Sequence, residues 1–150
     1  MDHRTTAETP ALASGGPASE HVLLALVERA RQASASAYAP YSKFRVGAAV
    51  VARDGSVYAG CNVENASYGL TICAERCAIW KAVSEGHTDL VALAVYTPTD
   101  TITPPCGACR QVAYEFGAGM AIICSSEGGT RNHTIAELLP GAFGPSDLGK

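Results

Sequence analysis

Residues 90–124 read LVALAVYTPTDTITPPCGACRQVAYEFGAGMAIIC and predict a strand, a helix and a second strand. Leu90 to Thr97 is a continuous apolar run, short enough for a buried strand. A helix is expected from Cys106 to about Phe116, and Met120 to Cys124 predicts the next strand. Because strand–helix–strand units favour parallel pairing with a right-handed crossover, this stretch predicts an α/β fold.

The segments on either side extend the sheet and add helices. Asp54-Gly55 is a turn signal between two apolar runs and predicts a hairpin. Ser19 is a candidate cap for a first helix that Pro40 ends, and Gly86 is the stop of a second helix. We expect helices over residues 20–37, 73–84 and 135–139, hairpin strands over 44–52 and 57–63, and a strand or turn near 131–133. These elements predict a mixed sheet with helices on both faces.

The composition favours one domain that binds small ligands. The chain has 150 residues, of which 47% are hydrophobic and 17% charged, and its formal net charge is −3. A nucleic-acid-binding domain would show a clustered basic excess, and no apolar run approaches the length of a membrane span, so we expect neither partner. The N-terminus does not have the pattern of a secretory signal, which favours a cytoplasmic protein. Residues 1–19 are predicted to be a disordered or weakly ordered tail, and residues 20–150 the folded domain.

The cysteines are predicted to be reduced. An even number could form disulfides, but a chain with this much apolar content needs no covalent staples, and intracellular thiols are usually kept reduced. The six are Cys61, Cys73, Cys77, Cys106, Cys109 and Cys124. We interpret them as metal ligands or core residues.

Two cysteine motifs, each at the expected start of a helix, predict a catalytic metal site. A helix N-terminus carries partial positive charge, which favours thiolate over thiol. Cys106 and Cys109 form a Cys-x-x-Cys motif, and Cys73 would supply a third thiolate. Three protein ligands and a fourth position left for water are the pattern of a catalytic zinc site. Glu75, two residues after Cys73, is placed to handle the proton of that water.

Cys77 offers an alternative interpretation of the same motifs. It lies four residues after Cys73, on the same helix face, so that four cysteines could close a structural zinc site. We favour a small buried side chain, because a structural site leaves the placement of Glu75 unexplained. Cys61 and Cys124 are expected in the core. The histidines, none at metal-ligand spacing, are His3, His21, His87 and His133.

Longer segments around these motifs carry a resemblance to a known family. They are Pro40-Tyr41-Ser42-x-Phe44-x-Val46-Gly47-Ala48-Ala49, Gly60-Cys61-Asn62-Val63-Glu64-Asn65-Ala66-Ser67-Tyr68, Cys73-Ala74-Glu75-Arg76, Pro105-Cys106-Gly107-Ala108-Cys109-Arg110-Gln111, Glu137-Leu138-Leu139-Pro140 and Phe143-Gly144-Pro145-x-Asp147-Leu148. Zinc deaminases share a His or Cys followed by x-Glu, and a later Pro-Cys-x-x-Cys. Over most of residues 38–148 the chain resembles the short, homotetrameric cytidine deaminases, and the tail lies outside the match.

The resemblance implies both the fold and the metal site. It implies a three-layer α/β/α sandwich with a mixed five-stranded sheet, one Zn²⁺ per subunit, and a homotetramer with active sites at subunit interfaces. Cys73, Cys106 and Cys109 match the zinc ligands, and Glu75 matches the proton shuttle. Arg76 is similarly implied to hydrogen-bond the ligand sulfurs.

The resemblance also implies a nucleoside pocket. Asn62 and Glu64 match the pair that holds the ribose 3′-hydroxyl, and Phe44 matches an aromatic wall near the nucleoside. From the residues alone, Asn62 and Glu64 share one strand face and could equally be a solvated hairpin edge.

Three further positions resemble contributions to a neighbouring subunit's pocket. They are the backbone near Ala66, the ring of Tyr68 and Phe143. From the residues alone, Phe44 and Tyr68 could be core aromatics, and Phe143 could pack the C-terminus.

The reaction implied is hydrolytic deamination of free cytidine and 2′-deoxycytidine in pyrimidine salvage. Zinc would supply hydroxide for attack at C4 of the cytosine ring. Glu75 would take the proton of the water, give it to N3, and later help to protonate the leaving amine. Three thiolates make zinc a poorer Lewis acid, so we expect the two helix N-termini and Arg76 to offset their charge. The role of Arg110, as a second helper near the metal or a surface cation, stays open.

Other function classes are compatible with parts of this pattern. Another aminopyrimidine could be the substrate, although Asn62 and Glu64 favour a plain sugar hydroxyl. Deamination within RNA or DNA would call for a basic path along the strand, which the net charge of −3 does not suggest. A zinc-stabilised binding module is the non-enzyme alternative.

Overall fold

The computed structural model describes residues 18–150. The tail predicted over residues 1–19 lies outside the described residues, apart from Ala18 and Ser19. Ser19 is the N-cap of the first helix, as predicted, and its hydroxyl accepts a hydrogen bond from the Val22 amide (3.3 Å). Among residues 18–150, no helix is both long and apolar enough to cross a membrane.

Within the described residues, five strands form one mixed sheet in the order β2-β1-β3-β4-β5. They are β1 (Gly47–Ala52), β2 (Val57–Cys61), β3 (Leu90–Thr97), β4 (Ala121–Ser126) and β5 (Gly129–Thr134). β3 and β4 are parallel, and the other neighbouring pairs are antiparallel. The parallel pair is the one expected from residues 90–124, because α3 (Gly107–Phe116) crosses over between its two strands.

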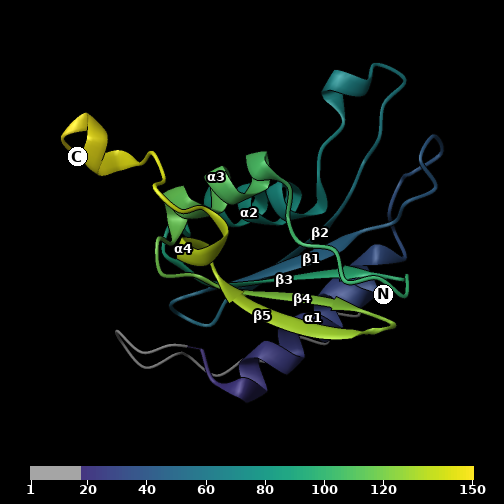
Figure 1. Ribbon diagram of the computed structural model, residues 1–150, viewed down its shortest axis with the longest axis horizontal. Coiled ribbons are helices and arrows are strands. Elements are labelled where there is room, and N and C mark those ends of the chain that lie inside the picture. Colours follow the sequence, from purple (N-terminus) through teal and green to yellow (C-terminus); the bar gives the residue numbers. More distant parts are fainter. Residues whose placement is uncertain (1–17) are drawn as a thin grey trace.

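Helices cover both faces of this sheet (Figure 1). α1 (Glu20–Ser34) lies on one face; α2 (Ala74–Ser84) and α3 lie on the other, with α4 (Ile135–Leu138) beside α3. Side chains alternate along a strand, so Ala49 and Val51 of β1 join the core under α1, whereas Ala48 and Val50 join the core under α2 and α3. The predicted three-layer α/β/α sandwich with a mixed five-stranded sheet is confirmed.

Two glycines allow the helices to approach the sheet closely. A Cβ on Gly47 would lie 1.9 Å from the Ala30 carbonyl oxygen of α1, and one on Gly60 would lie 2.7 Å from the Ala78 amide nitrogen of α2. Real Cβ atoms do not approach backbone atoms so closely, so a side chain at either position would push the helix away. Gly60 therefore sets the distance between β2 and the helix that begins beside Cys73.

Several boundaries differ from the prediction for local reasons. α1 ends at Ser34 rather than at residue 37, because the next amides bond three residues back in turn geometry (Ala37 N to Ser34 O, 3.2 Å). β5 is a full strand where only a strand or turn near 131–133 was predicted. Its exposed, polar residues carry no apolar alternation, and its pairing with β4 decides its conformation.

The predicted hairpin strands are also shorter than expected. β1 begins at Gly47, because the Asn62 side chain bonds the backbone groups of Phe44 and Val46 in place of a partner strand. β2 ends at Cys61, so Asn62 and Glu64 lie beyond the strand that was expected to hold both.

Candidate metal and substrate site

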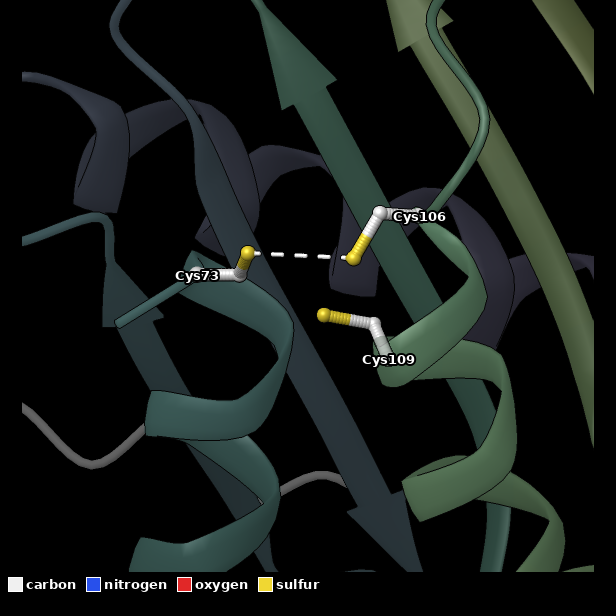
Figure 2. Close-up of side chains that lie close together, drawn as sticks. All are labelled: Cys73, Cys106 and Cys109. Atoms are coloured by element: carbon white, nitrogen blue, oxygen red, sulfur yellow. Dashed lines mark hydrogen bonds between the residues drawn. The ribbon is translucent and has the colours of Figure 1, made fainter. Parts of the chain in front are cut away.

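Three thiols from two helix starts lie close together. Cys73 is the N-cap of α2, Cys106 is the N-cap of α3, and Cys109 lies in the first turn of α3. Their sulfur atoms all lie within 4.8 Å of one another, and the Sγ atoms of Cys73 and Cys106 are 3.9 Å apart. Figure 2 shows the three side chains pointing toward one common point between the helices. The predicted Cys73, Cys106 and Cys109 cluster is therefore present in the fold.

The surroundings of this cluster favour negative charge on sulfur. The pKa of the Cys73 thiol is lowered to about 5, mainly by a hydrogen bond with Cys109 and further by the Arg76 guanidinium. The same hydrogen bond raises the pKa of Cys109, and its burial raises it further. In addition, each helix N-terminus places partial positive charge beside a sulfur. These surroundings favour the thiolate form that a metal requires of its cysteine ligands, and any remaining protons are released when a metal binds.

The cluster fits zinc on the chemistry of its donors. Zinc prefers thiolate and imidazole ligands in a tetrahedral arrangement, and three protein ligands leave one position for water. The Arg76 Nε is buried and has no hydrogen-bond partner. A buried donor without a hydrogen-bond partner lowers the stability of the folded protein. This donor belongs to a guanidinium that faces the thiols, and thiols lose their protons and become thiolates when they bind a metal.

The alternative closed site with Cys77 is not formed. Within the described residues, the thiols close enough to hold one ion are Cys73, Cys106 and Cys109, without Cys77. All six cysteines are free, as predicted, and Cys124 is buried. Cys77 and Cys61 are only half-buried, which corrects the expectation that both are core residues. At β2, the edge strand of the sheet, and on the adjoining surface of α2, their side chains keep contact with solvent.

Glu75 lies in the first turn of α2 and is buried, with 5% of its surface exposed. Burial raises the pKa of its carboxyl to about 7, and the charge of Cys73 adds to this shift. A carboxyl kept from water and close to the thiols can exchange a proton with a group bound between the helices.

Arg76 lies about one helical turn after Cys73 in α2 and faces the thiol cluster. Its Nη2 donates to Cys73 Sγ at 3.3 Å, and a hydrogen bond to Cys109 also contributes to its raised pKa. The guanidinium carbon lies 6.0 Å from the centre of the Trp80 ring, within the range of a cation–π contact. These contacts place a fixed positive charge against two of the three sulfurs.

Asn62 is buried, and its amide supports the neighbouring backbone. Its Oδ1 accepts from the Val46 amide (2.9 Å), and its Nδ2 donates to the Phe44 carbonyl (2.7 Å). An amide has two donors and an oxygen with two lone pairs, so half of this capacity is still available. Asn62 thereby fixes the backbone from which the half-exposed Phe44 ring projects.

Glu64 organises the adjoining turn. Its carboxylate accepts from the amides of Tyr41 (3.0 Å) and Ser42 (3.1 Å) and from the Ser42 hydroxyl. These hydrogen bonds, that of the Ser42 hydroxyl above all, lower the pKa of Glu64. A carboxylate offers about four acceptor directions, so one stays open toward a ligand.

A cavity of about 350 Å³ adjoins this turn, lined by Tyr41, Ser42, Glu64, Tyr68 and Thr71. The rings of Tyr41 and Tyr68, both on its wall, contact each other with their centres 5.8 Å apart. Thr71, on its wall, precedes Cys73 by two residues. The structure thus brings Glu64 and Tyr68 together.

Ala66, Tyr68 and Phe143 are exposed, the last two by 74% and 59%. The C-terminal end of the chain lies on the opposite side of the domain from the loop between β2 and α2 (Figure 1), and Phe143 is not among the residues that line the cavity. Phe143 is therefore not brought to the cavity of its own subunit.

The sequence did not predict the hydrogen-bond partners of Arg110 and Gln111 in α3, nor the partner of Glu64. Arg110 is not a free surface cation, because it donates to the carbonyls of Pro105 (2.8 Å) and Leu138 (2.9 Å). Gln111 donates to the Phe143 carbonyl (2.8 Å). Ser42 binds Glu64 with both its amide and its hydroxyl. Backbone carbonyls leave no trace in a motif, so no local signal could have revealed the targets of Arg110 and Gln111.

The sequence matches a family described as the cytidine and deoxycytidylate deaminase zinc-binding region over residues 21–125. A protein named cytidine deaminase from Halalkalibacterium halodurans is 51% identical over 125 residues, covering 82% of this chain and 95% of that protein. A cytidine deaminase from Mycobacterium tuberculosis is 47% identical over 119 residues, covering 79% of this chain and 87% of that protein.

Solved structures agree with these matches. The crystal structure of a cytidine deaminase from Burkholderia pseudomallei superposes with a TM-score of 0.77 at 46% identity, covering 84% of this chain and all of that one (100%). The crystal structure of a cytidine deaminase from Mycobacterium tuberculosis gives a TM-score of 0.71 at 44% identity, with 81% and 97% of the two chains covered. The similarity therefore spans the whole domain and is not confined to the cysteine motifs.

Proposed function

The chain belongs to the zinc-dependent cytidine deaminase family, and from this premise we propose that it hydrolyses free cytidine and 2′-deoxycytidine to uridine and 2′-deoxyuridine with release of ammonia. One observation carries the proposal. The cluster of Cys73, Cys106 and Cys109 adjoins a buried carboxyl, Glu75, that lies two residues after the first thiol. A structural zinc site needs no such carboxyl, whereas a hydrolytic one does.

Cys73, Cys106 and Cys109 would hold one Zn²⁺ per subunit, with the fourth position open. Zinc bound there would lower the pKa of a water molecule and so supply hydroxide near neutral pH for attack at C4 of the cytosine ring. Glu75 would accept the proton of that water and pass it to N3, and would then carry the proton of the new C4 hydroxyl to the leaving amine as the C4 carbonyl forms. Because the carboxyl is buried, it exchanges protons with the bound substrate more readily than with solvent.

The sugar would bind between the Asn62 amide and the Glu64 carboxylate. Each keeps unused hydrogen-bonding capacity, and each is held in place by backbone contacts to residues 41–46. Such fixed groups suit a ribose 3′-hydroxyl, which both donates and accepts. The half-exposed Phe44 ring would lie against the nucleoside.

The pocket would be completed by a second subunit of a homotetramer. Tyr68 is largely exposed on the wall of the cavity that contains Glu64, and Phe143 is exposed but does not line that cavity. Two exposed aromatic rings suit surfaces that become covered when subunits assemble. The backbone near Ala66, the Tyr68 ring and the Phe143 ring would therefore line a neighbour's pocket, and a mass measurement in solution tests the tetramer.

The decisive experiment is ammonia release from cytidine and from 2′-deoxycytidine, with zinc content measured on the same sample. The wild-type protein should release one ammonia per nucleoside consumed, and Glu75→Ala should retain zinc but lose the activity. Zinc-loaded wild-type protein that releases no ammonia from either nucleoside would refute the proposal. A cytoplasmic location and a role in pyrimidine salvage stay predictions that follow from this activity.

A further inference from the structure

One face of α3 holds the C-terminal segment, which we define as residues 139–148. Cys109 and Ala113 form the buried face of this helix, whereas Arg110, Gln111 and Tyr114 lie on another side. The Gln111 Nε2 donates to the Phe143 carbonyl at 2.8 Å. The helix that carries two of the three thiols therefore also contacts the backbone of Phe143.

A second contact fixes the residue that follows Phe143. Gly144 is buried, and a Cβ at this position would lie 2.5 Å from Cε1 of the Tyr114 ring, so the backbone rests directly on that ring. The Gly144 amide donates to Asp147 Oδ2 at 2.8 Å, which closes the short turn Pro145–Leu148. The backbone on the C-terminal side of Phe143 is thus held by shape and by a hydrogen bond.

The N-terminal side of the segment is anchored to the same helix. The Arg110 Nη1 donates to the Leu138 carbonyl at 2.9 Å, at the end of α4. The chain then turns at Gly141, whose φ of +63° suits glycine, and arrives at Phe143. Between these anchors the Phe143 side chain stays 59% exposed, although the groups around its backbone are fixed.

Fixed backbone beneath an exposed aromatic ring is the arrangement expected of a ring that is presented to a partner. A ring of this size usually buries its surface, and restricting its backbone in advance lowers the entropy lost when it inserts into a pocket. The contacts that fix this backbone come from α3 of the same subunit, and their geometry depends on the side chain of Gln111.

We propose that Gln111 is a positioning residue for substrate binding: its amide holds the Phe143 carbonyl and so sets the direction in which the Phe143 ring enters the neighbouring subunit's nucleoside pocket. The inference rests on the proposed function, in which Phe143 lines that pocket. In this proposal Gln111 contacts neither the substrate nor the metal, so any effect of replacing Gln111 must pass through Phe143.

The test is a double-mutant cycle on steady-state kinetics with cytidine, using Gln111→Ala, Phe143→Ala and the pair. Loss of one well-formed hydrogen bond should raise the KM of Gln111→Ala about three- to tenfold and leave kcat within about twofold. Phe143→Ala should raise KM at least as much. In the Phe143→Ala background, Gln111→Ala should add nothing, because the group that it positions is already gone.

Two further variants separate positioning from general stability. Gln111→Glu keeps the length of the side chain but replaces its donor with an acceptor facing a carbonyl, so it should raise KM as Gln111→Ala does. Gln32→Ala removes an exposed amide on α1 that donates to Glu28 (3.1 Å), and KM should not change. Zinc content, thermal unfolding and mass in solution should match the wild type for all variants.

The possible contrary results are distinct from one another. Wild-type KM in Gln111→Ala, an additive effect in the double mutant, or loss of zinc or native mass in Gln111→Ala would each overturn the positioning role. Wild-type KM in Phe143→Ala would overturn it as well, by removing Phe143 from the pocket. Ammonia release by the wild-type protein would still establish the deaminase activity in every one of these cases.

Discussion

Replacing Arg76 with glutamine should slow the deaminase reaction more than it weakens substrate binding. The substitution removes a guanidinium that donates to Cys73 Sγ at 3.3 Å and whose pKa is also raised by a hydrogen bond to Cys109. Three thiolates leave a zinc ion with excess negative charge, which makes its water harder to ionise. Without Arg76, the partial charges of two helix N-termini are left to offset this excess.

The magnitude follows from the contacts. A hydrogen bond with a charged partner contributes about 1.5–3 kcal/mol, and about 1.4 kcal/mol in activation free energy changes a rate tenfold. We therefore expect kcat to fall about 10- to 100-fold in Arg76→Gln, in line with the usual effect of removing a partner of a metal ligand. KM should change less than threefold, because Arg76 faces the sulfurs rather than the residues that line the nucleoside cavity.

The assay is steady-state ammonia release from cytidine, normalised to the zinc content of each sample. Arg76→Lys keeps the charge without the planar fork of donors and should lie between the wild type and Arg76→Gln. The matched control is Arg31→Gln, which removes an exposed arginine of α1 bound to Glu28 and should leave kcat unchanged. A wild-type kcat in fully zinc-loaded Arg76→Gln would show that the sulfurs need no cation beside them.

Three further predictions test the metal site, the sugar site and the core. Cys77→Ser should keep one zinc per subunit while Cys109→Ser loses it, as measured by metal analysis, because Cys77 lies outside the thiol cluster. Glu64→Gln should raise KM for both nucleosides about tenfold with zinc retained, since it replaces a charged acceptor with a neutral one; a KM equal to that of the wild type would exclude a contact with the sugar. Gly60→Ala should lower the midpoint of thermal unfolding by several degrees, because its Cβ would meet an α2 backbone amide at 2.7 Å and overpacking costs about 1–3 kcal/mol. Gly119→Ala, where a Cβ would meet nothing within 4 Å, is its control.

The elements that the sequence predicted well are those with a strong local pattern. β3 has the bounds that its apolar run predicted, Leu90–Thr97, because a strand buried on both faces must be apolar throughout. α2 and α3 begin one residue after the cysteines at which they were expected to start, with Cys73 and Cys106 as N-caps. The thiol cluster followed from these two helix starts.

The features that the sequence could not predict depend on tertiary contacts. β5 is polar and exposed, so its conformation comes from its pairing with β4 rather than from its own residues. Asn62 and Glu64 were expected on one strand face, but the chain leaves β2 at Cys61, and hydrogen bonds to residues 41–46 place both side chains. Such bonds link residues about 20 positions apart through backbone groups, which every sequence has, so no motif marks them.

The two helices that carry the cysteines, α2 and α3, use the residues after their cysteines in different ways. We therefore expect replacements in α2 to change kcat and replacements in α3 to change KM. In α2, the residue one turn after Cys73 is Arg76, which acts on the sulfurs themselves, so its replacement should appear in kcat. In α3, the residues that follow Cys109 bind backbone carbonyls instead, Arg110 those of Pro105 and Leu138 and Gln111 that of Phe143. Gln111 therefore connects the helix that begins at Cys106 to the backbone of Phe143, and in the proposed pocket its replacement should appear in KM.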